Sequence, residues 1–121
     1  MSLKKRIKSF TYALKGFRLM LNHQPNFFIQ IGITIFVLLL SYFFELTRDE
    51  FLWIIVAIGI VLSAEIFNTA IEKLTDLVQP ESDPKAGQIK DLSAAAVLLL
   101  SITALVIGLI IFIPHLLTYL N

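Results

Sequence analysis

Three long apolar stretches constrain this chain more than any other feature of its sequence. They are Phe27–Phe44, Phe51–Leu77, whose second half is interrupted by charged residues, and Leu92–Leu117. Each can cross a hydrocarbon layer of about 30 Å as a helix, which takes about 20 residues. The stretches do not alternate in polarity and three strands cannot close a barrel, so helices are the expected spanning elements. Because 57% of the 121 residues are hydrophobic, a soluble core of this size could not absorb them.

We therefore expect an all-α integral membrane protein in which residues 1–121 form a single membrane domain. An amphipathic surface helix (3–22) is expected to precede three transmembrane helices, at 27–45, 51–78 and 91–117. The hydrophobic residues of the first helix recur at steps of three and four: Leu3, Ile7, Phe10, Leu14, Phe17 and Leu21. Its basic residues lie largely off this stripe, which is typical of helices in the membrane interface. A helix packed on a soluble partner is the alternative.

The ten Lys and Arg residues are unevenly distributed, although the net charge is only +1. Six precede the first expected span and three lie in or beside the connection between the second and third, whereas the first loop holds only Arg48. The positive-inside rule places the N-terminus and the 79–89 loop in the cytoplasm. That loop is rich in turn formers and should be non-helical over much of its length. The chain has no cysteine, which excludes thiol chemistry, and we expect no nucleic-acid partner.

The second apolar stretch carries a row of polar residues: Glu65, Asn68, Glu72 and Asp76, at steps of three, four and four. At about 100° per residue these side chains share one face of a helix. If the hydrocarbon begins near Phe51, Glu65 lies about 21 Å and Glu72 about 31 Å along the helix. Glu65 would then lie inside the cytoplasmic leaflet, Glu72 at its boundary and Asp76 in water. A charged residue at mid-membrane costs about 2.5–3.5 kcal/mol, which is usually tolerated for a function or a strong partner.

Two interpretations of this row remain open: a functional site, or polar contacts between helices of an oligomer. The row continues to the aqueous surface, which contacts between helices would not require, and this favours the interpretation as a functional site. At the start of the third span, Asp91 can cap the helix and Lys90 can extend to the interface. Alternatively, Lys90 meets phosphate while Asp91 supports metal or polar contacts. The small residues Ser93–Ala96 allow a neighbouring helix to approach closely.

The motif Glu65-Ile-Phe-Asn-Thr-Ala-Ile-Glu72, with Asp76 and Lys90-Asp91 beyond it, resembles the prokaryotic diacylglycerol kinase family, which includes undecaprenol kinases. The likeness covers nearly the whole chain. It implies a homotrimer in the bacterial inner (cytoplasmic) membrane, with active sites at subunit contacts near the cytoplasmic interface. It also implies that a membrane lipid alcohol is phosphorylated, with ATP as co-substrate and Mg²⁺ as cofactor. The product is phosphatidic acid from diacylglycerol, or undecaprenyl phosphate from undecaprenol.

The resemblance further implies roles for the matched residues. Glu65 looks like the general base that takes the proton from the lipid hydroxyl, and Asn68 should help to position the reacting groups. Glu72 looks like a Mg²⁺ ligand beside the ATP phosphates. The expected nucleotide contacts are Lys90, Asp91, Lys5, Tyr12, Glu81 and Asp83.

One position departs from the family's pattern. Gln24-Pro-Asn-Phe27 stands where the family commonly has E-x-N-F, so that Gln24 replaces a second metal-binding carboxylate. An amide oxygen can still bind Mg²⁺, but without charge. This motivates a second hypothesis, a catalytically weak or inactive regulatory membrane homologue. A third, a proton or ion conduit with Glu65 as relay, predicts polar residues further along the helix, and Phe51–Ile60 has none.

Overall fold

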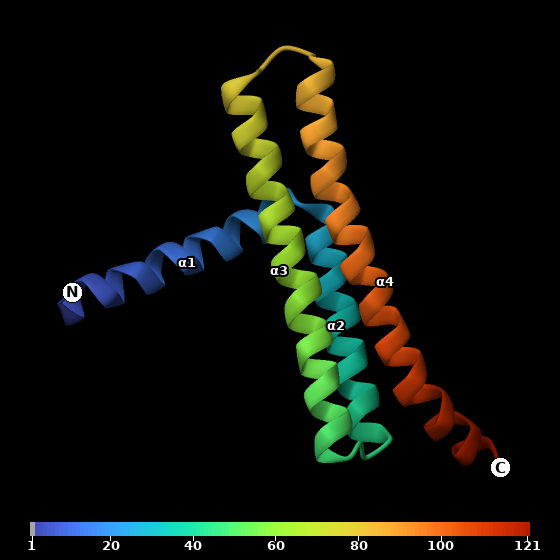
Figure 1. Ribbon diagram of the computed structural model, residues 1–121. Helices are drawn as coiled ribbons and strands as arrows, with labels where there is room; N and C mark the ends of the chain where they lie inside the picture. Colours follow the sequence, from blue (N-terminus) through green and yellow to red (C-terminus); the bar gives the residue numbers. More distant parts are fainter. Residues whose placement is uncertain (1) are drawn as a thin grey trace. The chain divides into compact units, whose positions relative to one another are not determined.

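The computed structural model describes residues 2–121, which form helices and no strands (Figure 1). Two compact units are distinguished, Met1–Phe36 and Val37–Asn121, and the second helix runs from one into the other. The predicted all-α class is confirmed. The four helices are α1 (Leu3–His23), α2 (Pro25–Phe43), α3 (Arg48–Val78) and α4 (Pro84–Leu120).

Local signals explain where α1 begins and ends. The Ser2 hydroxyl accepts a hydrogen bond from the backbone N–H of Lys5, at 3.3 Å, and so caps the helix. At the other end the N–H of Gln24 donates to the carbonyl of Met20, and Pro25 follows as the first residue of α2. Proline is favoured at this position because its fixed φ suits a helix and it has no N–H to leave unpaired. Along α1, the whole apolar stripe and all the Lys and Arg residues are exposed.

A capping box starts α3. The Thr47 hydroxyl accepts from the N–H of Glu50, and the Glu50 carboxylate accepts from the N–H of Thr47, at 3.2 and 3.0 Å. Ahead of it, Glu45 has a positive φ of 52°, which lets the chain reverse in a few residues. The Glu50 carboxylate also contacts the ring nitrogen Nε2 of His115 on α4, at 3.0 Å. This polar contact joins α3 and α4 at what we call the turn end of the second unit.

Helices α3 and α4 run antiparallel and pack against each other, joined by a short connection at residues 79–83 (Figure 1). We call this the loop end. The buried residues of α3 include the small side chains of Ala57 and Ala64. Small residues were also predicted to allow close approach at Ser93–Ala96 on α4; there Ser93 is buried, whereas the three alanines are exposed. The predicted contact is therefore limited to one residue of that stretch within this chain.

The non-helical part of the predicted 79–89 loop is shorter than expected, because it covers residues 79–83 and α4 already begins at Pro84. Asp83 is its N-cap: one carboxylate oxygen accepts from the N–H groups of Lys85 and Ala86, at 2.8 and 3.4 Å. Asp91, which the sequence offered as a cap, lies inside the helix. An Asp-Pro pair at the N-cap and first helical position is a strong start signal, and it overrides the turn-forming composition.

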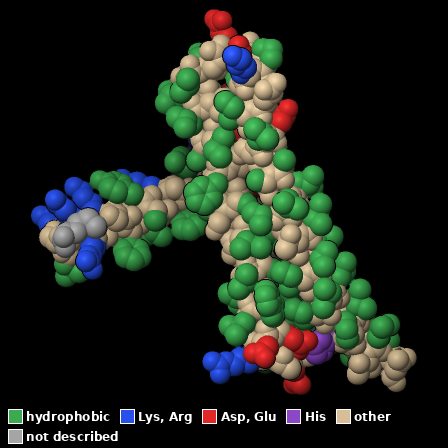
Figure 2. Space-filling view, viewed as in Figure 1, with side chains coloured by type: hydrophobic (Ala, Val, Ile, Leu, Met, Phe, Trp, Pro, Cys, Tyr) green, Lys and Arg blue, Asp and Glu red, His purple; other side chains and the backbone are tan. Residues whose placement is uncertain are grey.

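Three of the helices, α2, α3 and α4, are long and apolar enough to cross a membrane. Large hydrophobic side chains are exposed along all of them. In the second unit they cover most of the visible surface, and charged side chains gather towards its two ends (Figure 2). A soluble monomer rarely exposes so much apolar surface. The protein is therefore of the membrane class, as its sequence predicts.

Candidate active site

The polar row lies on α3, and its burial decreases towards the loop end. Glu65 is buried, with 7% of its surface exposed. Asn68 and Glu72 are half-buried and Asp76 is exposed. At about 1.5 Å per residue, Glu65 and Glu72 are separated by about 10 Å along the helix axis.

Within the row, Asn68 is bonded to Glu72. The Asn68 amide Nδ2 donates to Oε1 of Glu72, at 3.0 Å. If the amide were turned over, its oxygen would face a Glu72 carboxylate oxygen, and two acceptors would repel each other. The hydrogen bond therefore also determines that the amide oxygen of Asn68 faces away from Glu72. That atom, Oδ1, is buried and has no hydrogen-bond partner among the residues described.

A cation is brought to the row from α4. Lys90 Nζ donates to Asp76 Oδ1, at 2.5 Å, and the pair joins the two helices near the loop end. The predicted phosphate-binding lysine is thus held one helical turn from Glu72. The neighbouring Asp91 is exposed.

Two other predicted nucleotide contacts lie in and beside the loop. Glu81 is exposed, and its backbone carbonyl accepts from Nε2 of Gln79, at 3.5 Å. The Asp83 side chain is occupied in capping α4. Their contact with nucleotide stays a prediction.

The remaining predicted site residues belong to the first unit. Lys5 and Tyr12 are exposed on α1, and Gln24 is half-buried at its C-cap. The Tyr12 ring is contacted by the ammonium of Lys15, 5.6 Å from the ring centroid, which the sequence did not predict. The roles of Lys5 and Tyr12 with nucleotide, and of Gln24 with metal, stay predictions.

The residues of the row fit a Mg²⁺ ion that is shared with phosphate. No group of three or more His, Cys, Asp or Glu residues within 2–121 could hold a metal ion by itself. The Glu72 carboxylate is a hard oxygen donor of the kind that Mg²⁺ takes, and Asn68 holds it in place through their hydrogen bond. Mg²⁺ is usually held by one or two carboxylates together with substrate phosphates, so a site with few protein ligands agrees with this ion.

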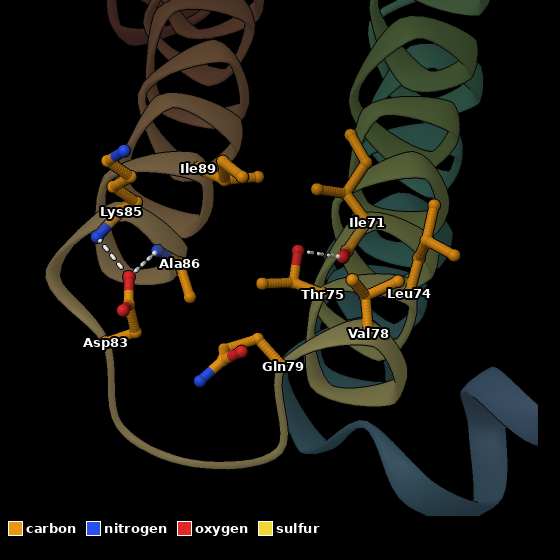
Figure 3. Close-up of a pocket in the computed structure, with 9 residues that line it drawn as sticks. All are labelled: Ile71, Leu74, Thr75, Val78, Gln79, Asp83, Lys85, Ala86 and Ile89. Atoms are coloured by element: carbon orange, nitrogen blue, oxygen red, sulfur yellow. Dashed lines mark hydrogen bonds between the residues drawn. The ribbon is translucent and has the colours of Figure 1, made fainter.

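A separate cleft of about 490 Å³ lies between α3 and α4 at the loop end (Figure 3). Its lining is mostly apolar and includes Leu74, with Asp83 and Lys85 at the start of α4. Leu74 is two residues from both Glu72 and Asp76, and so lies about 160° around the helix from each. The cleft is therefore on a different face of α3 from the polar row.

Asp76 has no role that its sequence position predicts, and in the structure it is paired with Lys90. A partial signal was present, since Asp76 continues the row at the four-residue spacing that follows Glu72. Its partner is fourteen residues further on, across the turn between two helices. Such a pairing depends on the rotation of α4 against α3, which spacing within one helix does not specify.

Comparison with known proteins now adds to this geometry. The family profile of prokaryotic diacylglycerol kinase matches residues 11–112. An undecaprenol kinase of Bacillus subtilis is 34% identical over 114 residues, covering 94% of this chain and 93% of the relative. A diacylglycerol kinase of Haemophilus influenzae is 27% identical over 107 residues, covering 88% and 91%. The chain with this polar row is therefore a lipid kinase and belongs to the prokaryotic diacylglycerol kinase family.

Proposed function

We propose that this kinase transfers the γ-phosphoryl group of ATP to undecaprenol, with Mg²⁺ as cofactor. The observation that carries the proposal is the buried Glu65 at one end of a row that also holds Glu72 and the Asp76–Lys90 pair. The higher identity to an undecaprenol kinase supports this lipid. Diacylglycerol is the second candidate, supported by the Haemophilus influenzae relative.

The proposed setting is the inner membrane of a bacterium, with α2, α3 and α4 as spans of one membrane domain. The basic residues of α1 and of the loop end support a cytoplasmic N-terminus and loop. The apolar stripe of α1 supports an amphipathic helix in the interface. We also propose a homotrimer, since the exposed apolar side chains of the spans leave ample surface for contacts between copies.

In the proposed reaction, the lipid hydroxyl oxygen bonds to the γ-phosphorus of ATP. The bond from that phosphorus to the β–γ bridging oxygen breaks, and ADP leaves. Glu65 accepts the hydroxyl proton as the new bond forms. Its burial keeps bulk water away, which favours transfer to the lipid over hydrolysis of ATP.

The rest of the row would serve the nucleotide. Glu72 would hold Mg²⁺ together with the phosphates, Gln24 would add a neutral ligand, and Asn68 would keep the Glu72 carboxylate in position. When bound, the ion would neutralise charge on the phosphoryl group being transferred. Lys90 would bind phosphate oxygens, with Asp91 and the other predicted contacts around the nucleotide.

The test is transfer of labelled phosphate from ATP, with Mg²⁺, by the purified protein to undecaprenol, diacylglycerol and shorter polyprenols. We expect transfer with undecaprenol preferred. Loss of a general base lowers rates by about 10²- to 10⁴-fold, so Glu65→Gln should reduce kcat by that much. Glu45→Gln, an exposed glutamate at the turn end, is the matched control and should retain activity.

Absence of transfer to every lipid would favour the inactive homologue. Equal transfer by Glu65→Gln would remove the assignment of Glu65 as base. A preference for diacylglycerol would overturn the choice of undecaprenol and leave the lipid kinase in place.

A further inference from the structure

The ion pair between Asp76 and Lys90 is the feature of the row that the proposed chemistry does not yet use. Lys90 Nζ lies 2.5 Å from Asp76 Oδ1, and it crosses from α4 to α3. The two side chains remain 39% and 61% exposed, respectively. Ion pairs this exposed contribute little to folding, because solvent screens them and two flexible side chains must be ordered. The pair therefore has a small structural effect, and its geometry calls for a further explanation.

The pair determines where the Lys90 ammonium lies. A lysine in the second turn of a membrane helix ordinarily extends its flexible stem towards water. Here Asp76 holds the ammonium at the face of α3 that carries Glu72, one helical turn away. Lys90 is thus oriented towards the row by a contact within the chain itself.

The held ammonium can still receive phosphate. A lysine ammonium has three N–H donors, and one of them is directed at Asp76. With 39% of the side chain exposed, the others remain accessible to phosphate oxygens. Along α3, Glu72 lies between Glu65 and Asp76, and Asp76 is one turn beyond Glu72 towards the loop end. The negative charge of Asp76 is therefore directed away from the phosphoryl group that is transferred near Glu65.

We propose that Asp76 is a positioning residue, which orients the Lys90 ammonium for the phosphates of the bound nucleotide without contacting the nucleotide itself. The proposal rests on the proposed function, in which Lys90 binds phosphate. Its consequence is that Asp76 acts only through Lys90. Removing Asp76 should therefore weaken nucleotide binding when Lys90 is present and have no effect when Lys90 is absent.

The experiment measures the dissociation constant of Mg-ATP by calorimetry on the full-length protein in detergent micelles. We expect Asp76→Ala to weaken binding about fivefold, the upper range for an exposed ion pair. Asp76→Glu keeps the charge and should restore most of the affinity. Asp76→Asn, which keeps the acceptor oxygen and a similar shape, should be intermediate and provides a second test if the alanine variant misfolds.

The deciding comparison uses Lys90→Met with and without Asp76→Ala. We expect the same dissociation constant for both, and little change in kcat at saturating ATP for Asp76→Ala alone. Asp49→Ala, an exposed acidic residue at the opposite end of α3, is the matched control. Unchanged or tighter binding by Asp76→Ala, or a further loss in the Lys90→Met background, would overturn the proposal.

This readout separates the two proposals. A wild-type protein that binds Mg-ATP but phosphorylates no lipid would defeat the proposed function, and the variants would still decide the role of Asp76. A wild-type protein that binds no nucleotide would defeat both.

Discussion

At the scale of single residues, the hydrogen bond from Asn68 to Glu72 decides how the proposed metal ligand is presented. The amide donates through Nδ2, which orients the carboxylate and leaves Oδ1 as an open, buried acceptor. Two residues four apart on a helix can make this contact whatever surrounds them. Asn68 is therefore expected to act on the metal through Glu72.

Asn68→Ala should raise the Mg²⁺ concentration needed for half-maximal activity by about tenfold, the lower range for loss of a hydrogen bond to a metal ligand.

Gln24→Glu should instead lower this Mg²⁺ concentration, because a carboxylate adds charge to the ligand set. Both are measured by titrating Mg²⁺ at saturating ATP. Thr103→Ala is the control, since the Thr103 hydroxyl donates within α4, to the carbonyl of Leu99. An unchanged Mg²⁺ requirement in either variant would reject the metal role of that residue.

At the scale of secondary-structure elements, the start of α4 shapes the loop end. Asp83 caps the helix and Pro84 is its first residue, so the helix begins well before the first apolar residue of the third span. Lys90 consequently lies in a formed helix instead of a loop, and its position is defined relative to α3. The cap therefore supports the geometry of the Asp76–Lys90 pair as well as the helix.

Asp83→Ala should destabilise the protein by about 1 kcal/mol, because two N–H groups lose their acceptor. Asp83→Asn should retain most of the stability, since its side-chain oxygen can still accept. The measurement is thermal unfolding in micelles followed by circular dichroism. Equal stability of the alanine variant and the wild type would exclude the capping contribution. A raised KM for ATP in Asp83→Asn, without loss of stability, would assign the carboxylate to the nucleotide.

At the scale of the whole molecule, charge distribution governs the orientation in the membrane. Six of the ten Lys and Arg residues precede α2 in the sequence and three lie in or beside the connection between α3 and α4, whereas the connection between α2 and α3 with its flanks holds only Arg48. Moving this excess of positive charge across a bilayer is unfavourable, which is the physical basis for expecting a cytoplasmic loop end.

The absence of cysteine from the sequence makes this orientation directly testable. Ser82→Cys places a thiol in the exposed loop, and Asn121→Cys places one at the exposed C-terminus. In spheroplasts, a membrane-impermeant maleimide should label Asn121→Cys at once and Ser82→Cys only after permeabilisation. The parent protein, without a thiol, is the control. The reverse labelling pattern would contradict the proposed topology.

The sequence by itself determined the all-helical membrane class and the alignment of Glu65, Asn68, Glu72 and Asp76 on one face. Both follow from local rules: the length of apolar stretches and the period of a helix. The early start of α4 also had a local signal, the Asp-Pro pair, although composition argued for a longer loop. Only the tertiary structure decided that Lys90 meets Asp76 and that Glu50 meets His115. These contacts depend on how α4 is rotated and shifted against α3, and packing between helices sets that relation.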